Sequence, residues 1–293
     1  MAKLEFILID GSKKEFKKIE LIDSDLNALK SARCKLQSIL RLEELYDLII
    51  ESYLEFKSQL YSNSLLLPNI NTSIQENHNI RSKLNRQLFN TLNLTKLYLD
   101  KHYRKDKDKS FVKKVTKDVT LHQKVSDLRE KIYEESSNYK LGCELRNFVQ
   151  HSTIPVGTFS YSINSKNTPP KIGFHLPLVK MELKERGASN KLLNLIEEND
   201  DIHKIMDGYI NAISLMHMQN RELTSQKIEL SLKIFQQQVE KTEQEFGKNH
   251  QGISVVKNDK SLFTLDLEWF ELVPYLQQKH ACTINYRKFE YII

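Results

Sequence analysis

The sequence predicts a mainly α-helical protein with β-rich segments at both ends. Glycine (8 residues) and proline (6 residues) are scarce in this chain of 293 residues, which favours long helices over many short strands and tight turns. Apolar residues recur at helical spacing over several long segments. The apolar runs stay well short of the roughly 18 residues that a membrane-spanning helix needs, so no membrane partner is expected.

The N-terminal half is predicted to be a β-hairpin followed by three helices. Residues 3–22 alternate apolar and polar side chains around the turn sequence Asp-Gly-Ser, as the strands of a hairpin do. Asp23 or Ser24 can cap the first helix because both side chains accept hydrogen bonds from free backbone N–H groups. A polar loop is expected over residues 68–79. The three expected helices cover residues 24–61, 81–103 and 119–150.

The C-terminal half adds a second hairpin, another long helix and a strand-rich tail. Residues 155–183 carry two strand-like runs around a turn-rich stretch, and are predicted to form a β-hairpin inserted between helices. A short helix over residues 188–198 precedes a long one, which begins after Asp201 and ends near Gly247. Three strand-like pieces follow in the tail, at residues 252–256, 262–268 and 282–292.

These elements predict three parts in one chain. Residues 1–23 form an N-terminal β-hairpin, residues 24–247 form a helical domain that carries the inserted hairpin, and residues 248–293 form a strand-rich C-terminal segment. The two β-rich ends are expected to pair with each other in one small sheet.

Cysteine usage indicates a reducing compartment. Cys34, Cys143 and Cys282 are odd in number, lie far apart and form no Cys-x-x-Cys pattern. This spacing argues against a disulfide framework and against a zinc site made of cysteines. The chain also begins with a strand-like alternation rather than the apolar core of a signal peptide. A cytoplasmic location is therefore expected.

The excess positive charge lies in one short stretch, residues 101–117, which we call the basic segment. It contains eight Lys or Arg and two Asp, a net charge of +6 that equals the formal net charge of the whole chain. Its polar middle offers no apolar face for packing, so a mobile loop is predicted. Such a segment attracts polyanions by releasing their counterions, although a solvated lysine-rich loop has the same composition. The candidate RNA-binding residues are Lys101, Arg104, Lys105, Lys107, Lys109, Lys113, Lys114 and Lys117.

The most distinctive stretch is Leu-Arg-Asn-Phe-Val-Gln-His at residues 145–151. At about 100° per residue, the apolar side chains of this helix cover one side, whereas Arg146, Asn147 and His151 fall outside that arc. Arg146 and His151 are roughly 140° apart around the helix axis. Two copies related by a twofold axis would bring such residues together. Glu144 projects close to the direction of His151 and is a candidate supporting residue.

The side chains of this trio suit the cleavage of an RNA phosphodiester. An imidazole with a pKa near neutrality can take the proton of the ribose 2′-hydroxyl or protonate the leaving 5′-oxygen. A guanidinium matches the non-bridging oxygens and stabilises the charge that builds up on them. An amide can bind a phosphate or fix the imidazole tautomer. Because the 2′-hydroxyl is the nucleophile, the reaction needs no metal, and neither a metal nor a cofactor is expected.

The Arg-Asn-x-x-x-His pattern resembles the signature of the HEPN superfamily, in which a His follows an Arg after four to six residues and Asn often stands directly after the Arg. The resemblance implies a helical bundle of four or five helices, a homodimer that pairs the two motifs, and metal-independent endoribonuclease activity. It assigns the essential pair to Arg146 and His151 and an accessory polar role to Asn147. Many such proteins are toxins or anti-phage defence factors, so RNA and a neutralising antitoxin or defence protein are the implied partners.

The resemblance covers only this motif and the helices around it. The inserted hairpin and the tail have no counterpart, and Thr153 stands where nucleotidylated members carry a tyrosine, which argues against that form of control. The alternative hypothesis is a non-catalytic HEPN-like scaffold or RNA-binding interaction protein, in which the polar trio holds an interface. A third hypothesis is a sensor whose inserted hairpin binds a ligand and gates a latent nuclease. An exposed Arg and a His favoured by the dipole at a helix C-terminus would also give this pattern.

Three histidines outside the motif also bear on function. His102, at the start of the basic segment, and His122, just after it, are predicted to lie on the solvated surface, from which they would be able to touch RNA. His217 stands between Met216 and Met218. This neighbourhood is compatible with a soft-metal site, but the helical spacing of Met216 favours packing in the core.

Overall fold

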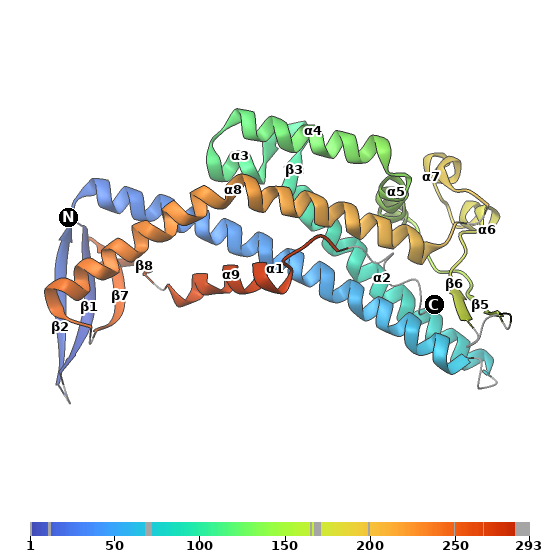
Figure 1. Ribbon diagram of the computed structural model, residues 1–293, viewed down its shortest axis with the longest axis horizontal. Helices are drawn as coiled ribbons and strands as arrows, with labels where there is room; N and C mark the ends of the chain where they lie inside the picture. The colour runs from blue at the N-terminus through green and yellow to red at the C-terminus, as the bar shows by residue number, and fades with distance from the viewer. Residues whose placement is uncertain are drawn as a thin grey trace. The chain divides into compact units, whose positions relative to one another are not determined.

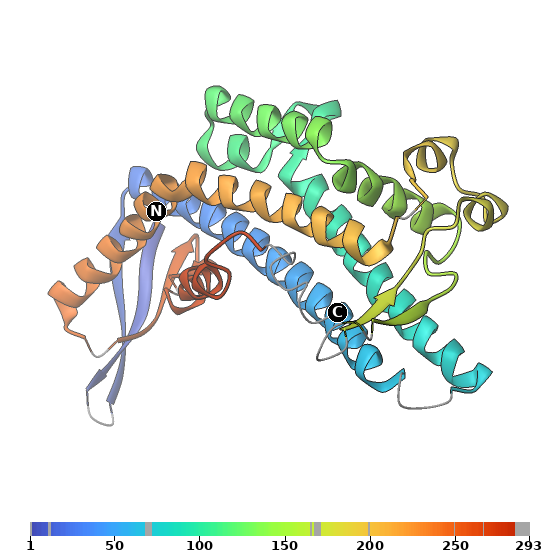
Figure 2. The same cartoon turned by 45° about the vertical axis from the view of Figure 1, so that its right-hand side comes forward.

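The computed structural model describes residues 2–10, 13–67, 72–164, 166, 171–198, 200–248, 250–265 and 267–284. The protein is mainly α-helical, with 70% of its residues in helices and a small antiparallel sheet built from both ends of the chain. Figures 1 and 2 show the long helices and the two β-rich regions. The predicted fold class is confirmed at this level. No helix within the described ranges combines the length and apolar character needed to cross a membrane.

Two helices of more than forty residues, α1 and α8, are the longest elements of the fold. The helices are α1 (Asp23–Leu66), α2 (Ile74–His102), the 3-10 helix η2 (Lys105–Lys107), α3 (Phe111–Thr116), α4 (Val119–Glu135), α5 (Ser137–His151), α6 (Lys180–Glu185), α7 (Asn190–Leu195), α8 (Ile202–Phe246) and α9 (Glu268–Lys279). The strands are β1 (Ala2–Asp10), β2 (Lys13–Leu21), β3 (Tyr103–Arg104), β4 (Lys109–Ser110), β5 (Ser160–Asn164), β6 (Lys171–His175), β7 (His250–Lys257) and β8 (Lys260–Thr264).

The chain divides into two compact units. Unit 1 consists of Met1–Glu44, Val115–Lys117 and Arg221–Ala281. Unit 2 consists of Leu45–Lys114, Asp118–Asn220 and Cys282–Ile293. Both long helices contribute to both units, because α1 enters unit 2 after Glu44 and α8 enters unit 1 after Asn220. The motif on α5 belongs to unit 2.

Unit 1 is built around a four-stranded antiparallel sheet in the order β2-β1-β7-β8. The N-terminal strand β1 pairs with β2 on one side and with the C-terminal strand β7 on the other, where Leu4 lies opposite Val255. Leu4 and Phe6 are buried, and the ring of Phe6 packs edge-on against Phe246 of α8 with centroids 5.1 Å apart. The predicted pairing of the two ends in one sheet is therefore confirmed.

A buried ion pair connects three helices of unit 1. Arg221 of α8 donates from Nη2 and Nε to the carboxylate of Glu43 on α1, at 2.7 and 3.0 Å. The same guanidinium donates to the carbonyl of His280 at the end of α9, and Gln277 of α9 donates to Glu43 at 3.2 Å. One arginine therefore satisfies both a buried carboxylate and a helix C-terminus, in the bidentate geometry that guanidinium and carboxylate groups prefer.

Two glycines allow α5 and α8 of unit 2 to approach closely. A Cβ atom on Gly142 would lie 2.4 Å from the Tyr209 ring, and one on Gly208 would lie 2.5 Å from Cβ of Asn138. Real side-chain contacts are not that short, so any larger residue would push the two helices apart. The close approach buries the side of α5 that carries Gly142 against α8, and Arg146, one turn further along, lies on that same side.

Two predicted helix boundaries are corrected by the structure. The second helix begins at Ile74 rather than near residue 81, because Ser73 and Glu76 form a capping box in which the backbone N–H of Ser73 donates to Glu76 at 2.6 Å and Ser73 accepts from the Glu76 N–H at 3.2 Å. The helix predicted over residues 119–150 is instead two helices, α4 and α5. Ser136 separates them because its hydroxyl accepts the N–H of Tyr139 at 3.1 Å and so starts α5.

The C-terminal half mostly follows the prediction. The inserted hairpin is β5 paired antiparallel with β6, and the long helix after Asp201 is α8. The short helix α6 was not anticipated. Residues 282–284 are not in a strand, and residues 285–292 of the predicted last strand lie outside the described residues. All three cysteines are free thiols, and Cys34 and Cys282 are exposed on the surface.

Candidate active site

The motif occupies the last two turns of α5, the helix that ends at His151. Leu145 and Phe148 are buried, Arg146 and Asn147 are half-buried, and His151 is exposed. The exposure predicted for the polar trio is confirmed only for His151. The half-buried Arg146 lies one turn after Gly142, on the side of α5 that faces Tyr209 of α8, and the neighbouring Glu144 is buried.

Arg146 and Asn147 are joined by a hydrogen bond from Nη2 to Oδ1 at 3.0 Å. The Nε–H of Arg146 is buried and has no hydrogen-bond partner among the described residues. A buried donor without a partner costs about 1–3 kcal/mol, so an added acceptor at this position would be bound favourably. The nearby Cys143 does not supply one, because burial raises the pKa of its thiol and keeps it neutral.

His151 lies between two residues that anchor the backbone. Gln150 donates from Nε2 to Oδ1 of Asn93 on α2 at 3.2 Å, and Ser152 donates to the carbonyl of Gly187 at 3.2 Å. Within the described part of the chain, no hydrogen bond or ion pair involves the imidazole of His151. The backbone at this position is held on both sides while the imidazole stays accessible, which is the situation of a side chain available to act on a ligand.

Glu144 makes a contact that the sequence did not indicate. Its carboxylate is buried and accepts a hydrogen bond from Lys191 of α7 at 2.6 Å. This hydrogen bond raises the pKa of Lys191. Among the described residues no hydrogen bond connects Glu144 to His151, so the visible role of Glu144 is to attach α7 to α5.

A single copy of α5 does not bring Arg146 and His151 together. They are five positions apart, which corresponds to about 7.5 Å along the helix axis and about 140° around it. Within one helix the guanidinium and the imidazole therefore point in different directions.

The basic segment is folded, so the prediction of a mobile loop was wrong. It contains β3, η2, β4 and α3, and β3 pairs with β4. His122 of α4 fixes the polar middle, because its Nε2 is bonded to Asp108 at 2.9 Å and its Nδ1 to the Ser110 hydroxyl at 2.8 Å. The ring of His122 is buried rather than on the predicted solvated surface. Polar contacts to a buried histidine thus hold the polar middle, while Tyr103, Phe111, Val112 and Val115 on either side of it are buried apolar residues.

Three of the eight basic side chains in this segment take part in ion pairs. These are Arg104 with Asp106 (2.7 Å), Lys105 with Glu130 (3.2 Å) and Lys113 with Asp108 (2.6 Å). The other five are exposed and form no ion pair with a described residue: Lys101, Lys107, Lys109, Lys114 and Lys117. The segment therefore keeps positive charge that is accessible to a polyanion, but less of it than the sequence count suggests.

A buried polar cluster in unit 2 was only partly anticipated. Asn220 is bonded to Nδ1 of His102 at 3.0 Å and donates to the hydroxyl of Tyr98 at 3.1 Å. Tyr98 in turn is bonded to Nδ1 of His217 at 3.2 Å, and the ring of Tyr46 stacks on His217 with centroids 3.9 Å apart. The core position predicted for His217 is confirmed. The surface position predicted for His102 was wrong, because its side chain is buried in this network.

Burial, followed by the charge of Arg129, lowers the pKa of His102 to about 3. The unfolded chain protonates this histidine near pH 6.5, so between pH 6.5 and 3 the unfolded state binds one proton more than the folded state. We therefore expect stability to decrease on acidification, by about 2 kcal/mol at pH 5 from this residue. Urea denaturation at pH 7, 6 and 5 measures the effect. His102→Asn should reduce the pH dependence, and an unchanged dependence in this variant would contradict the assignment.

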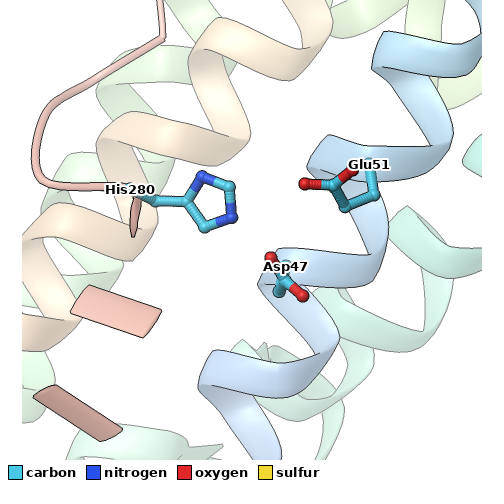
Figure 3. A group of neighbouring side chains, drawn as sticks. All are labelled: Asp47, Glu51 and His280. Carbon is cyan, nitrogen blue, oxygen red and sulfur yellow. The ribbon is translucent and has the colours of Figure 1, made fainter. Parts of the chain in front are cut away.

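Two carboxylates on α1 have a spacing that is compatible with a metal. Asp47 and Glu51 lie one turn apart in unit 2, as Figure 3 shows. Two carboxylates supply fewer oxygens than the six to eight that Ca²⁺ usually takes. His280, also labelled in Figure 3, belongs to unit 1, where its carbonyl accepts a hydrogen bond from Arg221. We assign no metal site to the carboxylate pair.

No protein-family model, curated protein or solved structure matches the chain. The similarity to HEPN proteins therefore depends on the motif residues of α5 and their helical surroundings. The site has to be interpreted from the positions and contacts of its own side chains.

Proposed function

We propose that the protein is a metal-independent endoribonuclease of the HEPN type that acts as a homodimer, in the role of a toxin or an anti-phage defence effector. One observation supports this proposal most strongly. The last turn of α5 presents the exposed imidazole of His151, and five positions before it the half-buried guanidinium of Arg146 has a buried Nε–H without a hydrogen-bond partner among the described residues. Parts of α1, α2, α4, α5 and α8 lie together in unit 2, which is compatible with a bundle of five helices.

In the proposed reaction the ribose 2′-oxygen attacks the neighbouring phosphorus and the bond to the 5′-oxygen breaks. His151 exchanges protons with these oxygens as general acid or base. Arg146 stabilises the negative charge on the non-bridging oxygens. Asn147 accepts a hydrogen bond from Arg146 and so positions the guanidinium, and its amide N–H groups would donate to a phosphate oxygen. The products are a 2′,3′-cyclic phosphate and a 5′-hydroxyl.

A surface next to the motif supports the proposed dimer. A groove of about 450 Å³ between α1 and α2 is lined by the apolar residues Leu48 and Leu97, which are 53% and 48% exposed, and by polar residues that include Asn93, Glu51 and Glu55. Asn93 also accepts the hydrogen bond from Gln150, the residue before His151. Exposed apolar residues beside an incomplete site favour coverage by a second copy. That copy would bring its own α5 close to the first.

We expect Leu97→Glu to convert a wild-type dimer into a monomer, because the new carboxylate replaces an apolar contact, loses its hydration and adds to the negative charge of Glu51 and Glu55 in the same groove. Sedimentation equilibrium should show at least a tenfold weaker self-association, and RNA cleavage should fall in parallel. Val119→Glu is a matched control, since Val119 is 67% exposed on α4. A monomeric wild type, or a Leu97→Glu variant that dimerises normally, would contradict the proposed interface.

The proposed activity is tested directly with the wild-type protein. Structured RNA is incubated with the protein in EDTA, and the product ends are identified by their sensitivity to phosphatases and kinases. We expect cleavage in EDTA and 2′,3′-cyclic phosphate ends. A requirement for added metal, or products with 3′-hydroxyl ends, would exclude the proposed chemistry. If no RNA is cut with any candidate activating partner, the non-catalytic scaffold becomes the preferred interpretation.

A further inference from the structure

Unit 2 contains an open cavity of about 560 Å³, away from the motif, between the start of α2 and strand β5. Its volume falls within the roughly 300–1,000 Å³ typical of small-molecule sites. One wall is a helical stripe of α2 formed by Ile74, Asn77, His78 and Arg81, which have the i, i+3, i+4, i+7 spacing of residues on one helix face. Figures 1 and 2 show β5 next to the N-terminal part of α2.

The opposite wall is aromatic. Phe159 and Tyr161 both line the cavity and are two residues apart on the extended chain that enters β5, so their side chains point to the same face. The ring of Phe159 stacks on Phe174 of β6 at 5.4 Å and is held in place, whereas Tyr161 is 44% exposed. A flat ring that enters the cavity meets a fixed aromatic surface on this side.

Hydrogen bonds to α2 fix the segment that leads into this wall. Asn85 donates to the carbonyl of Val156 at 3.0 Å and accepts its N–H at 2.9 Å. Arg81 donates from Nη1 to the carbonyl of Gly157 at 3.1 Å. This bond uses one of the five N–H donors of the guanidinium and directs the group along the cavity wall. The cavity is therefore formed before any ligand arrives.

The charge around the cavity selects for anions. None of the described residues that line it is acidic, whereas the lining includes the guanidinium of Arg81 and the imidazole of His78. Two carboxylates lie nearby, and each already has a hydrogen-bond or ion-pair partner. Glu76 accepts the N–H of Ser73 within the capping box, and Glu182 forms an ion pair with Arg186 at 3.5 Å. The N-terminal, positive end of the α2 helix dipole also lies at this cavity and adds to its preference for an anion.

We propose that this cavity is a binding site for a small aromatic anion, a compound with a flat ring and one carboxylate or phosphate group. The ring packs against Phe159 and Tyr161. The anionic group pairs with Arg81, and His78 supplies a second donor. This site is separate from the proposed RNA-cleaving residues and uses none of them.

The test uses the full chain with 2-naphthoate as the probe. Isothermal titration calorimetry compares it with 2-naphthamide, which keeps the ring and lacks the charge, and with acetate, which keeps the carboxylate and lacks the ring. We expect 2-naphthoate to bind at least tenfold more tightly than either of them. No binding of 2-naphthoate, or equal binding of the amide, would overturn the proposal.

Variants locate the bound anion. Arg81→Gln should weaken 2-naphthoate binding at least tenfold, and Arg86→Gln is the matched control, because Arg86 is an exposed arginine of the same helix outside the cavity lining. Equal effects of the two variants would show that the probe responds only to overall charge and would overturn the proposal. Urea denaturation checks the folding of each variant. If Arg81→Gln is destabilised, His78→Gln, an exposed position, replaces it with an expected weakening of at least threefold.

Discussion

His151→Ala is expected to lower the rate of RNA cleavage by about 10²–10⁴-fold, the usual contribution of a general acid or base, without changing the fold or the dimer. The imidazole is exposed and has no partner among the described residues, so its removal leaves no buried group unsatisfied. The rate is measured on a fluorescent RNA in EDTA, and the oligomeric state by sedimentation. Ser137→Ala, an exposed position at the other end of α5, is the control and should retain full activity.

The outcome also separates the catalytic proposal from its alternative. Loss of cleavage with an unchanged dimer supports catalysis, whereas loss of the dimer supports a scaffold in which the trio holds an interface. Equal cleavage by His151→Ala and wild type would contradict the proposed role of this residue.

Mixing two inactive variants tests whether a site combines residues of two copies. Arg146→Gln removes the cation and should lower cleavage by about 10²–10³-fold. A mixed dimer of Arg146→Gln and His151→Ala keeps one intact pair if each site takes its arginine from one copy and its histidine from the other. Random mixing should then restore about a quarter of the wild-type activity. No restoration would show that each copy carries a complete site.

The second large effect concerns stability. Arg221→Met is expected to lower the free energy of unfolding by about 3–5 kcal/mol, because it leaves the Glu43 carboxylate buried without its cation. The side chains of Arg221 and Glu43 are 13% and 3% exposed, and the variant also deprives the end of α9 of its donor. Urea denaturation at pH 7 measures the loss.

Two comparisons make this prediction specific. Lys105→Met breaks an ion pair whose side chains are 80% and 57% exposed, and should change stability by less than about 1 kcal/mol. The double variant Arg221→Met/Glu43→Leu should recover part of the loss, since a buried pair can be replaced by apolar residues at little net cost. If Arg221→Met is as stable as Lys105→Met, the pair does not hold unit 1 together.

Local periodicity explains most of what the sequence could predict. The N-terminal hairpin, the inserted hairpin and α8 each have a regular alternation or a long apolar stripe, and each is present in the structure. The same reasoning predicted the exposure of His151 but not the partial burial of Arg146 and Asn147, because the phase of a helix does not show which neighbouring helices cover each of its sides.

Contacts between distant residues explain what the sequence could not predict. Glu43 and Arg221 are 178 positions apart, and nothing local to either indicates the other. The partner of Glu144 lies on α7, and the basic segment is fixed by His122 from a later helix. Two helix starts that were not predicted do have local signals in the sequence. These are the capping box of Ser73 and Glu76 at the start of α2, and the serine at position 136 that caps α5.

The pairing of β1 with β7 has a consequence for synthesis on the ribosome. Strand β1 is synthesised long before β7, although Ala2 pairs with Lys257, so one edge of the hairpin stays open until β7 has been translated. Contacts this far apart in sequence form slowly, and an open strand edge can recruit other chains. Unit 1 is therefore expected to complete its folding only after β7 has been translated, and fragments that stop before β7 are expected to aggregate.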